Sequence, residues 1–263
     1  MLIFFKAILA ILVLYGATMI FVYYYQDAII FQGKPLPEDH IFTYDQAFEE
    51  YTIPTDDKEE INAILFKTNK ETANGIIIYS HGNSGNLVRW GSYAIDFTRL
   101  GYDVLMYDYR GYGKSSGKPS ETVLYRDAEM IWDWANKNFD YPRWVVYGRS
   151  IGAAVASYLA GKKQADLLGL ETPFDELNGA GGTAFLPFRL KYHFSNMEHL
   201  SGVQCKKFII YGGSDFTVPA SSTLRLKPFM KEGESFIRIP QGGHKNLRKF
   251  DLYHTKLAEM LKI

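Results

Sequence analysis

The sequence predicts an α/β protein, with a mostly parallel central sheet flanked by helices and a membrane-spanning helix at its N-terminus. Several apolar runs lack the polar alternation of a half-buried strand, as expected for strands covered on both faces; they lie at residues 75–80, 102–107, 144–147, 167–170 and 208–211. Helix-compatible segments separate these runs. Strands that alternate with helices favour a parallel sheet, and its working residues are expected at the carboxyl ends of the strands.

The N-terminal segment predicts a membrane anchor. Residues 7–25 carry no charge and, at about 1.5 Å per residue, are long enough to cross a hydrocarbon layer of ~30 Å. A cleaved signal peptide is the alternative, but the run is long for one and no small-x-small cleavage site follows it. We therefore expect an anchor over residues 1–26, which contacts the bilayer through residues 7–25, and a globular domain over residues 27–263.

The few charges that flank this segment predict its orientation. Lys6 and the α-amino group precede it, and Asp27 follows it. By the positive-inside rule the N-terminus is cytoplasmic, and the globular domain lies on the non-cytoplasmic side, which would be periplasmic or lumenal.

The remaining elements follow from local patterns. Residues 48–54 and 60–67 predict a hairpin, and Ser120 is a candidate N-cap for an amphipathic helix. Further elements are expected, in chain order, as helices at 87–100, 120–137 and 151–160, a strand at 236–239 and a helix at 247–261. Residues 172–202 interrupt the alternation and predict a short cap over the carboxyl edge of the sheet. Its aromatic side chains fit either a lid that lines an acyl groove or ordinary packing.

Composition excludes several kinds of partner. The 263 residues include 29 basic and 29 acidic ones, without a basic block, so the electrostatic field that nucleic-acid binding requires is missing. Cys205 is the single cysteine, so no internal disulfide can form, and no Cys/His cluster indicates zinc. We expect a packing role for Cys205, and neither nucleic acid, metal nor cofactor as a partner.

A candidate nucleophile lies in the pentapeptide Gly148-Arg149-Ser150-Ile151-Gly152. A serine exposed on a sharp strand-to-helix turn needs small neighbours two positions away on either side, which the glycines supply. The same Gly-x-Ser-x-Gly pattern occurs around Ser115, but there it lies in a polar loop. Because only Ser150 follows a buried strand and opens a helix, we expect Ser150 to be the nucleophile.

A serine hydroxyl needs a base, and the base needs a carboxylate that orients it. His244 follows the last predicted strand and is favoured over His254, which lies within the closing helix. Asp215 follows the strand at 208–211 and is favoured as the acid, with Glu171 as the alternative because it also ends a strand.

The oxygen of an attacked carbonyl becomes negatively charged and needs hydrogen-bond donors that already point at it. The backbone N–H of Ile151 at the start of a helix is one candidate, and the N–H of Asn83 after the strand at 75–80 is the other. We expect His81 to shape this loop by hydrogen bonding, and Asp108 to pair with Arg110.

These motifs resemble those of the α/β-hydrolase superfamily, and in particular its single-pass, membrane-anchored serine hydrolases. The resemblance covers roughly residue 48 to the C-terminus. The motifs that carry it are, in order, His81-Gly82-Asn83, Asp108-Tyr109-Arg110-Gly111-Tyr112-Gly113, Gly148-Arg149-Ser150-Ile151-Gly152, the turn at Asp215, and Gly243-His244. The resemblance implies an α/β-hydrolase fold with a short cap, and an activity in the range of esterases, monoacylglycerol or lysophospholipid lipases, and protein depalmitoylases.

The expected function is hydrolysis of a carboxylic ester or thioester through an acyl-enzyme, with an acyl or lipid substrate. An esterase with an open site for small soluble esters fits nearly as well. Two alternatives from other classes are a membrane-tethered binding or scaffold protein of the same fold, and a peptidase.

Overall fold

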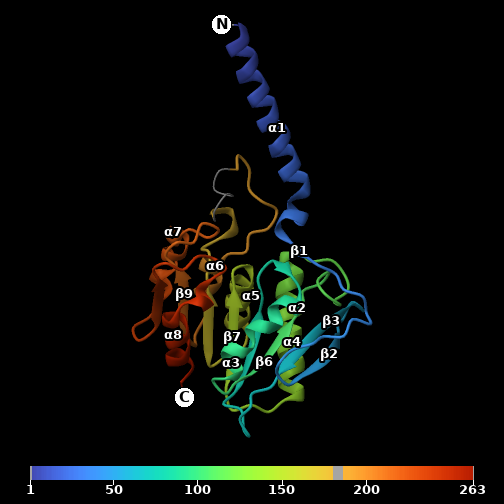
Figure 1. Ribbon diagram of the computed structural model, residues 1–263, viewed down its shortest axis with the longest axis vertical. Coiled ribbons are helices and arrows are strands. Elements are labelled where there is room, and N and C mark those ends of the chain that lie inside the picture. The colour runs from blue at the N-terminus through green and yellow to red at the C-terminus, as the bar shows by residue number, and fades with distance from the viewer. Residues whose placement is uncertain (1, 180–185, 263) are drawn as a thin grey trace.

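An eight-stranded sheet forms the centre of the protein, in a computed structural model that describes residues 2–179 and 186–262. In sheet order the strands are β10 (Ser235–Ile239), β9 (Lys206–Gly212), β8 (Leu167–Glu171), β7 (Trp144–Arg149), β4 (Ile76–Ser80), β6 (Asp103–Tyr107), β3 (Glu60–Phe66) and β2 (Phe48–Pro54). The strands from β10 to β6 run parallel to one another, whereas β3 is antiparallel to both β6 and β2. The predicted mostly parallel sheet is confirmed (Figure 1).

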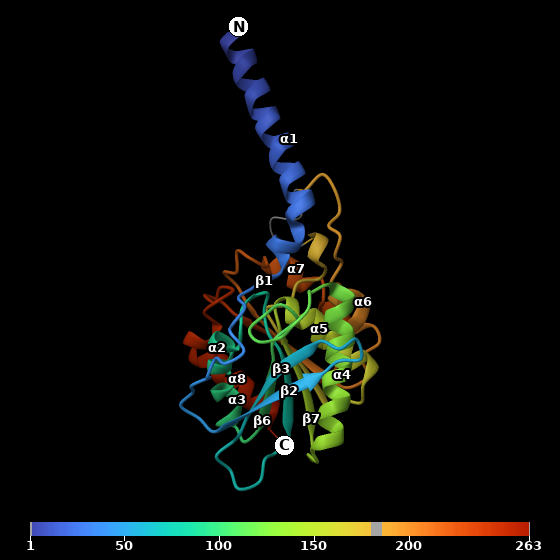
Figure 2. The ribbon, with the colours of Figure 1, turned by 90° about the vertical axis from the view of Figure 1, so that its right-hand side faces the viewer.

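Helices cover both faces of this sheet (Figure 2). The helices of the described chain are α1 (Leu2–Ile30), α2 (Leu87–Trp90), α3 (Ile95–Thr98), α4 (Glu121–Asn138), α5 (Ile151–Lys162), α6 (Asn196–Leu200), α7 (Ala220–Leu224) and α8 (Asp251–Leu261), with 3-10 turns at Gly91–Tyr93, Leu177–Gly179, Lys227–Phe229 and Leu247–Lys249; of these, α1 does not cover the sheet (Figure 1). Alternate residues of β4 belong to different cores: Ile76 and Ile78 pack with α4 and α5, whereas Ile77 and Tyr79 pack with α2, α3 and α8. Both faces of the strand are therefore buried, which explains its uninterrupted apolar sequence.

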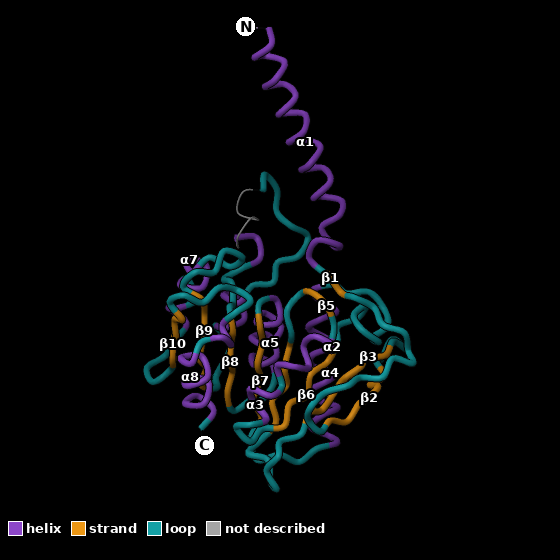
Figure 3. Tube along the Cα trace, in the orientation of Figure 1, coloured by secondary structure: helices purple, strands orange, loops and turns teal. Residues whose placement is uncertain are grey.

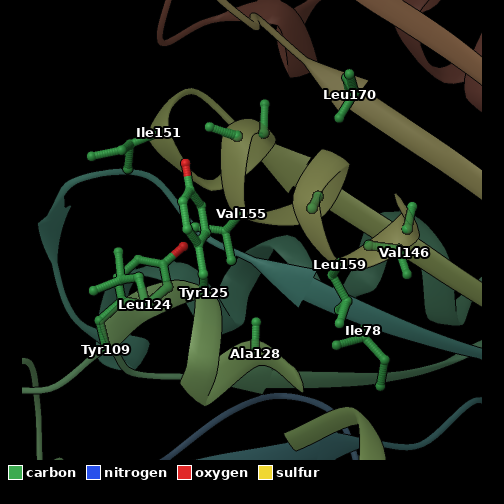
Figure 4. Close-up of a cluster of buried hydrophobic side chains, with 14 of the residues drawn as sticks. Ile78, Tyr109, Leu124, Tyr125, Ala128, Val146, Ile151, Val155, Leu159 and Leu170 are labelled. Carbon is green, nitrogen blue, oxygen red and sulfur yellow. The ribbon is translucent and has the colours of Figure 1, made fainter. Parts of the chain in front are cut away.

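The core under the candidate nucleophile is packed by α5. Figure 4 shows Val155 and Leu159 of this helix near Ala128 of α4 and near the sheet residues Ile78 and Val146; all five side chains are fully buried. The helix that follows Ser150 is thus fixed against the sheet along its length.

The N-terminal helix α1 stands away from the α/β domain (Figure 1). It contains a stretch, Phe4–Ile30, that is long and apolar enough to cross a membrane, and the predicted span at 7–25 lies within it. The predicted boundary after residue 26 falls inside the helix, whose last turn continues to Ile30 because Ile30 and Phe31 are buried against the domain. The chain then forms β1 (Gln32–Gly33), which pairs in parallel with β5 (Ser84–Gly85).

Two predicted elements differ in detail. The helix expected at 87–100 is interrupted by a 3-10 turn at Gly91, where an added Cβ would lie 2.4 Å from the Tyr44 ring. A larger residue there would displace that ring, so the local packing requires glycine at this position. The helix expected at 247–261 begins as a 3-10 turn and becomes α-helical at Asp251. Ser120 caps α4 as predicted, with its hydroxyl accepting from the Val123 amide at 3.3 Å.

The chain between β8 and α6 is mostly loop (Figure 3). It corresponds to most of the predicted cap at 172–202, of which residues 180–185, including Phe185, lie outside the described part. Phe188 makes an edge-to-face contact with Tyr23 of α1, with ring centroids 5.5 Å apart. This segment and the base of α1 therefore lie side by side.

Candidate active site

Ser150 lies at the turn between β7 and α5 with φ 55° and ψ −119°, a backbone conformation that is rare for residues other than glycine. The two neighbouring glycines allow a very close approach of backbone segments. A Cβ at Gly148 would lie 2.1 Å from the carbonyl oxygen of Gly152, and a Cβ at Gly152 would lie 2.1 Å from that of Ser80. Neither glycine can be replaced without moving the backbone, so the sequence spacing reflects a steric requirement of this turn.

Three side chains from separate strand ends form a hydrogen-bonded chain. The Nε2 atom of His244 lies 3.1 Å from the hydroxyl oxygen of Ser150, and its Nδ1 atom lies 2.8 Å from Oδ2 of Asp215. A carboxylate accepts at Nδ1, so the imidazole carries its proton there and Nε2 accepts from the serine hydroxyl. In this tautomer His244 can take the serine proton while Asp215 stabilises the imidazolium that results.

The carboxylate of Asp215 is itself fixed in orientation. Its Oδ1 atom accepts hydrogen bonds from the backbone amides of Thr217 and Val218, both at 2.8 Å. The side chain is 2 % exposed, and that of His244 is 12 % exposed. Asp215 therefore presents one oxygen to His244 while the other is held by the loop that precedes α7.

Glu171, the alternative acid, has a different partner. Its Oε1 atom lies 2.9 Å from Nε of Arg149, and its Oε2 atom accepts from the hydroxyls of Tyr147 and Tyr253. Arg149 in turn donates to the backbone carbonyl of His244. Burial by itself lowers the pKa of Arg149, but the Glu171 carboxylate and three nearby tyrosines (Tyr79, Tyr93 and Tyr253) together raise it above the usual value, so the arginine stays charged.

Arg149, the residue directly before Ser150, was not expected from the sequence to have a role in the site. The sequence does contain a pattern that predicts a contact for Arg149. The strands β7 and β8 are parallel neighbours, and they bring Arg149 and Glu171 into register at their carboxyl ends. Two opposite charges at the ends of two buried runs could have indicated this buried pair.

Asn83 and Ile151 line the same cavity as Ser150. Neither backbone amide donates a hydrogen bond to any residue within 2–179 or 186–262. Both are thus available to a ligand oxygen, and the Ile151 amide has the additional field of the α5 N-terminus.

The loop that carries Asn83 is built on a buried histidine. His81 is fully buried; its Nδ1 atom lies 2.7 Å from the Gly82 carbonyl oxygen and its Nε2 atom 3.3 Å from Oδ1 of Asp108. Burial raises the pKa of Asp108, although the hydrogen bond to His81 opposes this effect. His81 shapes the loop, as expected from the sequence.

The expected pair between Asp108 and Arg110 does not form. Arg110 instead contacts Asp127 of α4 and Asp57, at 2.8 Å each. Asp108 faces His81 and accepts from the Leu87 amide. The Arg110 side chain is long enough to reach Asp127 on α4, whereas the shorter Asp108 side chain contacts groups close to its own turn, His81 and the Leu87 amide.

The competing serine and histidine have structural contacts. The Ser115 hydroxyl donates to the Asp108 carbonyl at 2.7 Å and accepts from the Asn62 amide at 2.9 Å. His254 contacts Arg99, and its Nε2 atom lies 2.8 Å from the Arg248 carbonyl oxygen. Both side chains therefore form hydrogen bonds within the protein, and neither lines the cavity that Ser150 borders.

A cavity of about 410 Å³ opens beside Ser150 and His244, within the size range of small-molecule sites. Its apolar wall consists of Ile29, Ile30, Ile151, Phe174, Leu177 and Val218. The predicted cap contributes Phe174 and Leu177, whereas its aromatic residues Tyr192 and Phe194 are buried in the core. Tyr192 and Phe194 thus have the packing role that was one of the two expectations, whereas Phe174 and Leu177 line the cavity. Among the residues that the structure describes, no group of three or more His, Cys, Asp or Glu side chains could hold a metal ion.

The fold is that of an α/β hydrolase. A protein family described as serine aminopeptidase, S33, matches residues 71–170, and the chain belongs to the α/β-hydrolase superfamily. An uncharacterized protein of Mycobacterium tuberculosis is 29% identical over 242 residues, which cover 90% of this chain and 86% of that protein. Human alpha/beta hydrolase domain-containing protein 17B is 27% identical over 205 residues, or 76% of this chain and 70% of that one.

Solved structures show the same fold. An esterase of Pyrococcus furiosus superposes with a TM-score of 0.71 at 16% identity, covering 88% of this chain and 97% of the esterase. Est1E of Butyrivibrio proteoclasticus, solved with ferulic acid bound, gives a TM-score of 0.61 at 17% identity, covering 80% and 95%.

Proposed function

We propose that the protein is a serine hydrolase that cleaves carboxylic esters or thioesters through an acyl-enzyme. The observation that carries the proposal is the hydrogen-bonded chain from Asp215 through His244 to Ser150, which ends on a strained turn beside an open cavity.

In the first step the hydroxyl oxygen of Ser150 forms a bond to the carbonyl carbon while Nε2 of His244 takes its proton. The amides of Asn83 and Ile151 stabilise the negative oxygen of the tetrahedral intermediate. When the bond to the leaving oxygen or sulfur breaks, His244 gives it the proton. Water, activated by His244, then releases the acid and restores Ser150, so this class of reaction needs no cofactor.

The substrate we propose is an acyl ester or thioester that comes from a lipid. The apolar wall of the cavity suits an acyl chain, and two of its residues, Ile29 and Ile30, belong to the helix that is apolar enough to enter a bilayer. We propose residues 1–26 as the membrane anchor, residues 27–263 as the hydrolase domain, and residues 172–202 as its short cap. The solved esterases with the same fold support an ester substrate and do not select a lipid ester.

The test is hydrolysis of p-nitrophenyl esters of increasing acyl length by the full chain in detergent. We expect longer acyl groups to be preferred over acetate, and Ser150→Ala to lower kcat by about 10⁶-fold. Ser115→Ala is the matched control, since it removes a serine with the same flanking glycines. A preference for acetate would contradict the lipid substrate. If the wild type hydrolyses no ester, the binding or scaffold alternative replaces the proposal.

Peptide hydrolysis is a second candidate, because the matching family is described as a serine aminopeptidase. Turnover of aminoacyl p-nitroanilides alongside the ester series separates the two. We expect ester kcat/KM to exceed anilide kcat/KM, and the reverse order would favour a peptidase.

We further propose that the hydrolase domain lies on the non-cytoplasmic side of the membrane. Lys6 precedes the predicted span at 7–25 and Asp27 follows it, and positive charge is retained in the cytoplasm. In sealed membrane vesicles whose cytoplasmic face points outward, added protease should then leave the domain intact until detergent opens the vesicles. Degradation of the domain before the vesicles are opened would reverse the orientation.

A further inference from the structure

The end of the apolar helix α1 forms part of the candidate active site. Ile29, Ile30 and Gln32 border the same cavity as Ser150 and His244. Ile29 is 42 % exposed, whereas Ile30 is 7 % exposed and belongs to the core beneath the cavity. One continuous helix thus runs from its free N-terminal end to within the wall of the site.

The same segment also holds the loop that carries Asn83. The Gln32 amide donates to the Asn83 carbonyl at 3.0 Å, and the Asn83 side-chain amide donates to the Ile30 carbonyl at 3.2 Å. The Tyr112 hydroxyl donates to the Asn83 carbonyl as well, at 2.8 Å. The position of Asn83, and with it the position of its backbone N–H, therefore depends on contacts with residues 30–32 in addition to those of Tyr112 and of His81 with the preceding carbonyl.

The base of α1 is itself attached to the domain by several contacts. The Gln26 side chain is buried, and its oxygen accepts from the Lys191 amide at 2.5 Å. Lys191 also forms an ion pair with Asp27 at 3.2 Å. The Phe31 ring packs edge-to-face on Tyr192, with centroids 5.0 Å apart. These contacts hold residues 26–32 in place, so the segment is not a loose linker between anchor and domain.

We infer that the base of α1 is a working part of the hydrolase site: Ile29 determines which acyl chains fit, and Gln32 positions the Asn83 amide for the oxyanion. The inference rests on the proposed function and deepens it. An acyl chain that leaves a bilayer alongside α1 meets Ile29 before it reaches Ser150. The substrate class is therefore a lipid ester or thioester whose chain lies along this helix.

The first experiment changes the wall. Ile29→Trp fills part of the cavity and Ile29→Ala enlarges it, while Ile41→Trp and Ile41→Ala are matched controls at an isoleucine that is 83 % exposed and does not line the cavity. The full-length variants are assayed in detergent with p-nitrophenyl acetate, octanoate and dodecanoate. We expect Ile29→Trp to lower the ratio of dodecanoate to acetate kcat/KM by about 10-fold or more, since a misfit of even one methylene costs about that much. Equal profiles for the Ile29 and Ile41 variants would overturn the inference for Ile29.

The second experiment removes one backbone donor. Gln32→Pro deletes the N–H that donates to the Asn83 carbonyl, whereas Lys34→Pro deletes the N–H two residues further along, which donates to the Gly85 carbonyl and makes no hydrogen bond to Asn83. We expect Gln32→Pro to lower kcat by about 10- to 100-fold for every chain length, with KM unchanged, because small misplacements of a transition-state donor have effects of this size. Lys34→Pro reports the cost of disturbing the segment alone. If both variants lower kcat equally, or if Gln32→Pro raises KM instead, Gln32 has no positioning role.

The wild-type assay separates these failures from that of the proposed function. A wild type without any ester hydrolysis refutes the proposed function and this inference together. A wild type that hydrolyses esters, with variants that match their controls, refutes only the role of the helix base.

Discussion

Loss of the Arg149 guanidinium should destabilise the protein more than loss of any exposed charge. In the Arg149→Met variant the Glu171 carboxylate stays buried, 1 % exposed, with two tyrosine hydroxyls but no cation. Removing one partner of a buried pair costs about 3–5 kcal/mol, because the remaining charge is left uncompensated. At roughly 2–4 °C per kcal/mol for a domain of this size, Tm should fall by about 6–20 °C.

Two further variants isolate the physical cause. Adding Glu171→Gln to Arg149→Met removes the unpaired buried charge, and it should recover about half or more of the lost free energy of unfolding. Lys163→Met is the exposed control, because Lys163 pairs with Asp133 at 2.7 Å where the two side chains are 20 % and 63 % exposed. Such a pair contributes less than about 1 kcal/mol.

The assay is thermal or denaturant unfolding of the full chain in one detergent. A second readout is kcat measured below the unfolding transition, which should also fall because Arg149 no longer holds the carbonyl of His244. A loss of less than about 1 kcal/mol for Arg149→Met would refute the argument. A double variant no more stable than the single one would refute it as well.

Three other outcomes follow from the structure. Gly152→Ala should abolish both activity and the reaction of Ser150 with a fluorophosphonate, because the added Cβ would lie 2.1 Å from a backbone oxygen. Gly161→Ala is the control and should retain both, since the nearest neighbour of its Cβ is 3.7 Å away. A Gly152→Ala protein that is active would contradict the steric argument. Asp215→Asn should lower kcat by about 10⁴-fold while circular dichroism stays unchanged, since an amide donor at Nδ1 imposes the wrong imidazole tautomer; near-normal turnover would remove Asp215 from the mechanism. Burial raises the pKa of the Cys205 thiol to about 11. Iodoacetamide at pH 8 should therefore label Cys205 at least about 10-fold more slowly in the folded than in the unfolded protein. Equal labelling rates would show that the folded protein has an accessible thiolate.

The sheet could be predicted because its signals are local. Each of β4, β6, β7 and β8 is an apolar run that is buried on both faces, and such a run has few alternatives. The spacing of Gly148 and Gly152 was informative for a similar reason, since Gly148 approaches the carbonyl of Gly152 within the same turn, although Gly152 itself lies against Ser80 of the neighbouring strand.

The contacts that could not be predicted connect residues that are distant in sequence. Arg110 and Asp108 are neighbours with opposite charges, yet Arg110 pairs with Asp127 because α4 passes beside it. The helix α1 extends past the predicted boundary because Phe31 packs on Tyr192, more than a hundred residues away along the chain. Local charge and hydropathy patterns contain no information on such pairings.

Active-site labelling tests the central claim most directly. A fluorophosphonate reacts only with a serine whose hydroxyl is activated, and peptide mapping identifies which serine carries the phosphonate. The account predicts a single adduct on Ser150 in the wild type and in Ser115→Ala, and none in Ser150→Ala or after heat denaturation. A wild type that does not label, or a Ser150→Ala protein that labels equally well, would contradict it.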